Sequence, residues 1–279
     1  MKQIFNAIKD IYSGENKMQV HAVLFSIAGI GTIIESLTGD YAKSMQNVKT
    51  FDPNFFGQII GIIALIWLIS LVVKIFMLGF NVSFIHRKLA KLSGLPEIEN
   101  SFWLRGLMSF ILNFIWTLGI GLAFGIIIIP LSIIVAKGTI ALKIVSVLIM
   151  ILLAFGLALI TPFYSMLFIS YAKNFSLHGL FNPKLLVCYI KSSFNDVMIL
   201  LCKMLVLGIV LFAAIYVISI IVSALTSICG MDGKAIESLV MSLLGGYLGT
   251  ILSLITFYCL TFIYKGKVEQ ELLNNGLIQ

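Results

Sequence analysis

Residues 106–136 read GLMSFILNFIWTLGIGLAFGIIIIPLSIIVA and contain no charged side chain. A helix needs about 20 mostly apolar residues to cross about 30 Å of hydrocarbon, and this stretch would reach about 46 Å at a rise of about 1.5 Å per residue. Lipid offers no hydrogen-bond partner to a backbone amide, and the stretch lacks the alternation of a strand, so a helix is expected. Residues 106–136 therefore predict a membrane-spanning helix.

The composition of the whole chain also indicates a protein that lies in a lipid bilayer. Of the 279 residues, 60% are hydrophobic and 11% are charged, whereas an average soluble domain is nearer half apolar and a quarter charged. These proportions exclude a soluble globular protein, a disordered chain and a nucleic-acid-binding module. The net charge of +7 comes from basic residues strung between apolar stretches, so the lipid bilayer, and not nucleic acid, is the expected partner.

Six stretches in all meet the length criterion for a span. They cover residues 18–37, 55–80, 106–136, 140–171, 197–228 and 236–264. The predicted fold class is an all-α integral membrane protein with a single polytopic domain, in which six transmembrane helices form three hairpins. Residues 1–17 are expected to form an interfacial N-terminal helix, residues 18–264 the six-span bundle and residues 265–279 a cytoplasmic tail.

Two features of the spans leave alternatives open. In the first span the apolar, charge-free part is residues 20–34, about 22 Å of helix, with His21 and Glu35 near the two ends. Five spans with an interfacial first helix are the alternative there. Pro130 and Pro162 lie well inside the third and fourth spans, where they favour tilted or kinked helices, with discontinuous transporter helices as the alternative.

The positions of lysine and arginine predict the orientation, because cytoplasmic loops carry an excess of both. Five face outward if the N terminus is inside: Lys43, Lys49, Lys137, Lys143 and Lys234. Twelve then face the cytoplasm: Lys2, Lys9, Lys17, Arg87, Lys88, Lys91, Arg105, Lys173, Lys184, Lys191, Lys265 and Lys267. Lys74 and Lys203 lie inside spans near the inner end, where long side chains reach the interface. We expect a plasma-membrane protein with both termini in the cytoplasm.

Three amphipathic or aromatic-rich segments precede the hairpins on the cytoplasmic side. They cover residues 5–11, 95–105 and 181–194, and this pattern is typical of helices that lie in the headgroup plane. The segments are expected to form either a platform for lipid sensing or partner docking, or simple anchors that set depth and tilt.

Several short motifs carry a resemblance to a known family. They are Gly79, His86-Arg87-Lys88, Leu95-Pro96-Glu97-Ile98-Glu99-Asn100, Gly106-Leu107, Tyr171-Ala172 and Phe181. Over roughly residues 75–265 the chain resembles the bacterial and archaeal polytopic membrane proteins of domain-of-unknown-function family 4013. The family places an aromatic residue after Leu-Pro-Glu, where this chain has Ile98. The resemblance implies a six-helix membrane fold with cytoplasmic interfacial elbows, and it implies no activity or catalytic residue.

The Leu95-Pro96-Glu97 segment also predicts a turn on physical grounds. Pro96 disfavours helical geometry at Leu95 and so separates the basic stretch from the next helix. Glu97 and Glu99 are then expected in the first turn of that helix, where acidic side chains favour its positive end. We therefore expect a cap and an elbow here.

The sequence lacks the short motifs of common enzymes. It contains no H-E-x-x-H, no G-x-S-x-G and no G-x-x-x-x-G-K-[ST]. His21, His86 and His178 are far apart, and none has a metal-ligating neighbour at helical spacing. We expect a protein that is not an enzyme, with no catalytic, cofactor-binding or metal-binding residues and no cofactor.

One polar pattern recurs every four residues along the third span. The polar ridge consists of Arg105, Ser109, Asn113 and Thr117, and Gly121 and Gly125 continue its spacing. Neighbours at this spacing touch along one side of a helix, and small residues let two helices approach closely. The ridge is expected either to pack against another helix or to line a polar half-channel open to the cytoplasm. The last span carries a comparable run of Ser242, Gly245, Gly249 and Ser253.

The remaining charges inside the spans lie near span ends. Glu35 is the candidate intramembrane acid, expected either to sense an outer ligand or proton or to mark the water boundary of a short helix. Because ionisable groups near the bilayer centre are missing, we expect a non-enzymatic membrane scaffold or accessory component that binds lipid or other membrane proteins. A small-solute or peptide transporter is the alternative, for which the polar ridge and the prolines are the hints.

Overall fold

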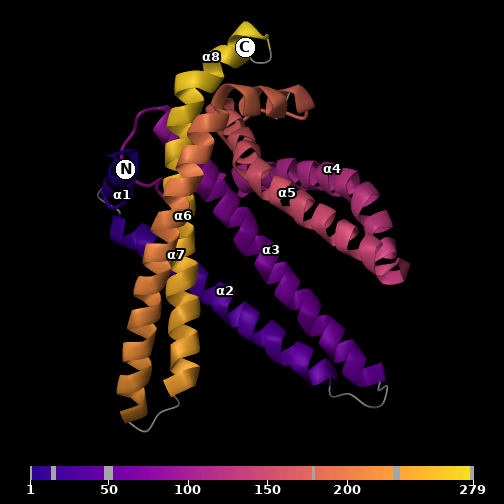
Figure 1. Ribbon diagram of the computed structural model, residues 1–279. Helices are drawn as coiled ribbons and strands as arrows, with labels where there is room; N and C mark the ends of the chain where they lie inside the picture. The colour runs from indigo at the N-terminus through magenta and orange to yellow at the C-terminus, as the bar shows by residue number, and fades with distance from the viewer. Residues whose placement is uncertain (1, 14–16, 47–52, 178–179, 229–232, 277–279) are drawn as a thin grey trace.

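The computed structural model is helical throughout almost all of its described part (Figure 1). It describes residues 2–13, 17–46, 53–177, 180–228 and 233–276, without the side chains of residues 32–46, 53–59, 158 and 233–235. Helix accounts for 90% of the chain, and no described residue is in a strand. The all-α class is therefore confirmed.

The described elements follow one another with short connections. They are α1 (Lys2–Ile11), α2 (Lys17–Gln46), α3 (Pro53–Leu89), α4 (Ser101–Lys137), α5 (Ile140–Asn174), α6 (Pro183–Ile228), α7 (Gly233–Ile263), the π-helical turn η1 (Tyr264–Val268) and α8 (Glu269–Asn274). The helices that hold the last five predicted spans are mostly longer than those spans, because the backbone hydrogen bonds of a helix continue past its apolar part.

Five stretches among the described residues are long and apolar enough to cross a membrane. They are Ile60–Leu89, Ser101–Lys137, Ile140–Asn174, Pro183–Ile228 and Ile236–Asn274. The last five predicted spans lie within α3 to η1. Apolar helices of this length are typical of a membrane protein. α2 is helical across the first predicted span, but it is not one of the five, and its side chains beyond residue 31 lie outside the described residues. The sixth span therefore stays a prediction.

The two prolines inside spans do not interrupt their helices. Pro130 lies within α4 and Pro162 within α5, and both helices continue beyond them. The missing amide of a proline removes one hydrogen bond and can kink a helix without ending it. Discontinuous helices are therefore not found at these two positions.

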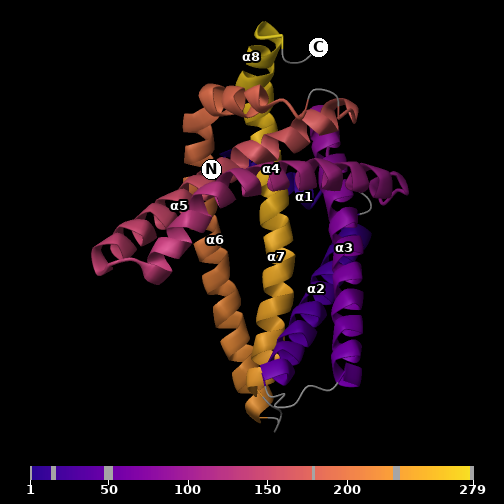
Figure 2. The same ribbon diagram turned by 90° about the vertical axis from the view of Figure 1, so that its right-hand side faces the viewer.

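The long helices form two groups that diverge in space. α6 and α7 run side by side and α2 and α3 extend at an angle to them, whereas α4 and α5 leave together at a steep angle (Figures 1 and 2). α6 packs most extensively against α7, and α3 against α4, while α2 lies more on α7 than on α3. The arrangement in three hairpins therefore stays a prediction, since among the described residues α2 contacts α7 more than α3.

The tightly packed core lies at one end of the chain's long helices. Its fully buried rings are Phe80, Phe84, Phe102, Phe163, Tyr171, Tyr189 and Tyr264. Away from this core, large apolar side chains such as Trp67 and Ile126 are about three-quarters exposed, at 76% and 75%. In a lipid solvent such side chains need no cover from the protein, since lipid tails are as apolar as leucine.

The predicted interfacial segments take three different forms. α1 buries Ile4, Ala7 and Ile11 against the core and contacts α7. The second segment is a loop only over residues 95–100, and α4 begins at Ser101. The prediction that Glu97 and Glu99 lie in the first turn of the helix is therefore wrong, because both precede it. The first turns of α6 lie across the end of the molecule before the helix turns to run along α7 (Figure 1).

The predicted C-terminal tail continues the last helix instead of leaving the fold. η1 and α8 extend α7 to Asn274, and Val268 and Leu272 are fully buried. A π-helical turn adds one residue to a helical turn, which changes the face that the following residues present. The described part of the segment after residue 264 therefore belongs to the packed core.

α3 and α4 cross at two glycines with their backbones in contact. A Cβ atom on Gly79 would lie 1.9 Å from the carbonyl oxygen of Phe102, and one on Gly106 would lie 2.0 Å from the carbonyl oxygen of Ile75. No side chain fits at these distances. The two glycines therefore set the separation of α3 and α4, and the rings of Phe80 and Phe102 pack edge to face at 5.9 Å beside them.

The glycines that were expected to pack closely take other roles. An added Cβ would meet nothing within 4 Å at Gly121, Gly125, Gly245 or Gly249. In α7 the close neighbour is instead Gly246, whose added Cβ would lie 3.3 Å from the Cβ of Ala28 on α2. Among the described residues these four glycines therefore make no close contact with another helix, because a spacing of four residues does not indicate which face meets another helix.

Candidate functional site

Arg105 lies where α3, α4 and the end of α5 meet. Its Nη1 donates a hydrogen bond to Ser83 Oγ at 2.9 Å and lies 3.9 Å from Glu99 Oε2. Its guanidinium carbon is 4.4 Å from the centroid of the Phe175 ring, within the range of a cation–π interaction. The one cation of the polar ridge therefore has partners on α3, on the loop before α4 and at the end of α5.

Phe175 connects this arginine to α3 a second time. The residue has a left-handed backbone, with φ 54°, and ends α5. Its ring centroid is 4.6 Å from that of His86 on α3, and His86 Nδ1 lies 2.7 Å from the carbonyl oxygen of Ala172. These contacts hold the ring in place over the guanidinium and join α3 to the end of α5.

The next two residues of the polar ridge are also engaged in contacts within the chain. Ser109 is fully buried and donates to the carbonyl oxygen of Arg105 at 2.7 Å. Asn113 Oδ1 accepts a hydrogen bond of 2.6 Å from the Tyr164 hydroxyl on α5. Thr117 is exposed, and beside it Trp116 Nε1 donates to the carbonyl oxygen of Leu180 at 3.0 Å.

Arg105 and Asn113 therefore join α4 to α3 and α5, whereas Ser109 bonds within α4. A hydrogen bond in a low-dielectric site is costly to break, so these two side chains act as a clamp between α3, α4 and α5. The cavities lined by Lys203, by Lys74 and by Lys184 contain no residue of the polar ridge. The contacts of Arg105 and Asn113 support the interpretation that the polar ridge packs against other helices.

The structure says less about the candidate acid Glu35 and about metal-binding residues. Glu35 lies in α2, and its side chain is outside the described residues. In the described ranges no group of three or more histidine, cysteine, aspartate or glutamate side chains could hold a metal ion. Neither finding tests the prediction that the protein has no cofactor.

A buried hydroxyl cluster joins α5, α6 and η1. Ser170 Oγ lies 2.7 Å from the hydroxyl of Tyr189 and 3.1 Å from that of Tyr264. The three side chains are almost completely buried. The sequence gives no signal for this cluster, because its members lie far apart along the chain and follow no common spacing.

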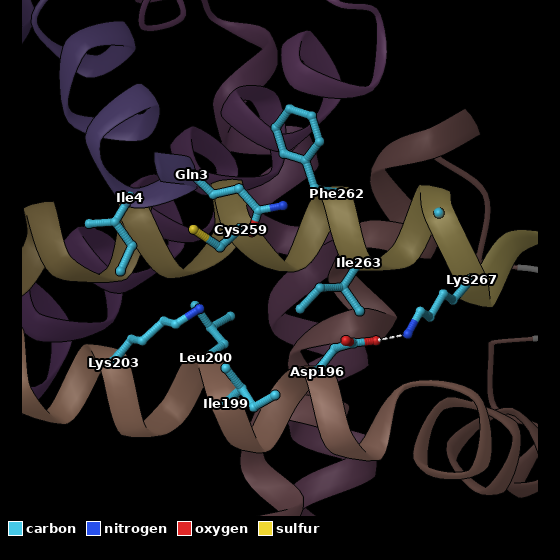
Figure 3. Close-up of a pocket in the computed structure, with 11 residues that line it drawn as sticks. Gln3, Ile4, Asp196, Ile199, Leu200, Lys203, Cys259, Phe262, Ile263 and Lys267 are labelled. Atoms are coloured by element: carbon cyan, nitrogen blue, oxygen red, sulfur yellow. Dashed lines mark ion pairs between the residues drawn. The ribbon is translucent and has the colours of Figure 1, made fainter. Parts of the chain in front are cut away.

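A cavity of about 280 Å³ lies between α1, α6 and α7 (Figure 3). Its polar lining residues are Gln3, Asp196, Lys203 and Lys267, and its apolar ones include Ile199, Leu200 and Phe262. Asp196 and Lys267 form an ion pair across one end of it. The sequence offered one signal for this site, which is the single lysine in the apolar stretch of residues 197–228.

A second cavity, of about 430 Å³, lies along α3 beside Phe110 of α4. Its walls are Ile63, Ile66, Trp67, Ser70, Leu71, Lys74 and Phe110. Lys74 is its one charged lining residue, so this cavity lacks the ion pair found beside Lys203.

Comparison with known proteins finds no relative of this chain. No family model matches the chain, and neither a curated protein nor a solved structure matches it. The resemblance to family 4013 therefore stays a prediction.

Proposed function

We propose that the protein is a non-enzymatic, multi-pass membrane scaffold or accessory component that binds lipid or partner membrane proteins. The observation that carries this proposal is the surface of the α4–α5 hairpin. None of the residues in the most apolar 18-residue window of α4 is buried, and the hairpin leaves the other long helices at a steep angle (Figure 2). A surface of this kind is covered by lipid or by another apolar helix.

Both helices of the hairpin contribute to this apolar surface. Its large exposed side chains include Leu118, Leu122, Ile126, Ile129, Ile144, Leu148, Ile151, Leu152 and Phe155. Gly121 and Gly125 add a small-residue face with open space above it. Two small residues four apart are the spacing at which transmembrane helices approach each other closely, which supports a partner helix as well as lipid.

The alternative, a small-solute or peptide transporter, rests on the polar ridge. Arg105, Ser109 and Asn113 have hydrogen-bond partners within the chain. A carrier that used them would have to break these contacts in each transport cycle. The scaffold proposal requires no such change and includes no cofactor, metal or nucleic acid.

We expect the full chain in liposomes to move no ions, amino acids or peptides faster than empty liposomes do. Asn113→Leu removes the acceptor for Tyr164, so it is expected to leave this baseline flux unchanged. Asn195→Leu, at an exposed position of α6, is the matched control. A flux that Asn113→Leu abolishes and Asn195→Leu retains, with both variants monodisperse and equally thermostable, would support the transporter and overturn the scaffold proposal.

The orientation in the plasma membrane, with both termini in the cytoplasm, is part of the same proposal. α1 and α8 lie towards the same end of the molecule (Figure 1), which supports an even number of spans. The excess of lysine and arginine beside that end supports the cytoplasmic assignment.

Cysteine labelling tests this orientation. In a chain whose own cysteines are replaced by serine, Ser93→Cys is expected to react only from the cytoplasmic side, because it lies in the loop between α3 and α4. Ser44→Cys is expected to react only from outside. If Ser13→Cys and Ser44→Cys react from the same side, the chain has five spans and α2 does not cross the membrane.

A further inference from the structure

The cavity between α1, α6 and α7 combines apolar walls with an excess of positive charge (Figure 3). Asp196, its one acidic lining residue, is paired with Lys267. The ammonium group of Lys203 has no ion pair or hydrogen bond within the described part of the chain. Figure 3 shows the Lys203 side chain running from α6 into the space between α6 and α7, while Ile4 and Gln3 of α1 line the cavity on the α7 side, Gln3 next to Cys259.

An unpaired ammonium group at this position needs an anionic partner or water. Lys203 is the one charged residue between Val197 and Ile228, and a lysine among apolar residues of a span is costly unless its charge reaches a polar group. Asp196, by contrast, lies seven residues earlier on α6, about 10 Å along the helix axis. The headgroup layer of one leaflet is about 5–8 Å thick. With the Asp196–Lys267 pair placed at the water side of this layer, Lys203 would lie near the hydrocarbon boundary.

We propose that this cavity binds the headgroup of an anionic phospholipid, with the phosphate held by the Lys203 ammonium and the Gln3 amide. The acyl chains would then continue over Ile199 and Phe262, which are 52% and 50% exposed. The Asp196–Lys267 pair leaves no free carboxylate for the cation of a zwitterionic headgroup, so a lipid with net negative charge fits best. The proposal rests on the lipid-binding part of the proposed function and names the lipid class.

The size of the cavity agrees with this occupant. Pockets that enclose a whole drug-sized molecule are about 300–1,000 Å³, so 280 Å³ suits a headgroup whose tails remain in the bilayer. The cavity at Lys74 is larger and has Ser70 as its one other polar side chain. That site lacks an amide and an ion pair and serves as the control.

The test measures lipid binding to the full chain in detergent micelles. The probes are phosphatidylglycerol, phosphatidylcholine with the same acyl chains, and inorganic phosphate, and the readouts are native mass spectrometry and the shift in melting temperature. Phosphatidylglycerol is expected to remain bound and to raise the melting temperature more than the other two probes. Lys203→Met is expected to weaken its binding by about tenfold, since a charge-assisted hydrogen bond is lost. Lys74→Met is expected to change it by less than about twofold.

Two further variants separate binding from folding. Lys203→Arg keeps the charge and is expected to retain phosphatidylglycerol binding. Gln3→Leu, on the exposed side of α1, is expected to weaken binding without changing the melting temperature in lipid-free detergent. Unchanged binding in both Lys203→Met and Gln3→Leu would overturn the site, and equal effects of phosphatidylcholine or of inorganic phosphate would overturn the lipid class. None of these results depends on the flux measurement that tests the scaffold.

Discussion

Gly106→Ala is expected to lower the free energy of unfolding by about 3 kcal/mol, the upper part of the usual range for an overpacked site. The added Cβ would lie 2.0 Å from the carbonyl oxygen of Ile75. Because the obstacle is backbone and not the end of a flexible side chain, α3 and α4 must move apart. That movement would also weaken the packing of Phe80 on Phe102. Unfolding by sodium dodecyl sulfate in mixed micelles measures the change.

Gly121→Ala on the same helix is the matched control. Nothing lies within 4 Å of an added Cβ at Gly121, and alanine is a better helix former than glycine by about 1 kcal/mol. The two substitutions should therefore have opposite signs, although they are chemically identical. Equal effects at both positions would show that the α3–α4 crossing does not set the stability of the fold.

The positions of the helices in the last five predicted spans follow from the sequence. A long apolar stretch has one stable structure in lipid, so residues 140–171 indicate α5 (Ile140–Asn174) to within three residues. The start of α6 is different, because Lys191 and Asp196 end the apolar pattern while the helix begins at Pro183. Hydropathy detects the part of a helix that suits lipid and not the part that stands in water or headgroups.

The contacts between the helices could not be predicted in the same way. In a soluble protein an apolar stripe indicates the buried face, but lipid-facing and protein-facing sides of a span are both apolar. The polar ridge was found from its spacing, whereas its partners Ser83, Tyr164 and Phe175 lie on other elements. Nothing in the spacing indicates them.

Asp10→Asn is expected to lower the free energy of unfolding by about 3 kcal/mol, as loss of one member of a buried ion pair commonly does. Asp10 on α1 pairs with Lys88 on α3, and their side chains are only 16% and 5% exposed. Lys88 also donates to the carbonyl oxygens of Leu92 and Gly94, at 2.8 and 3.0 Å. Without the carboxylate, a buried ammonium group keeps only neutral acceptors. The same micelle unfolding experiment measures the loss.

The Asp10 carboxylate also fixes the loop after α3, because the amide of Gly94 donates to its other oxygen at 3.1 Å. Asparagine can keep that bond, so Asp10→Asn isolates the effect of charge from the effect of shape. Glu269→Gln is the matched control, since Glu269 pairs with Lys173 at 2.9 Å and both side chains are about a third exposed. Exposed pairs contribute about 0–1 kcal/mol, so a small effect is expected there.

The double variant Asp10→Asn with Lys88→Met decides whether charge burial is the cause. Removing both charges removes the unpaired ammonium group as well as the attraction, and replacing a buried pair by neutral residues is often close to neutral. The double variant is therefore expected to be more stable than Asp10→Asn alone. If the two losses simply add, the pair does not interact, and the burial of Ile4, Ala7 and Ile11 and the bond from Gly94 hold α1 to the core.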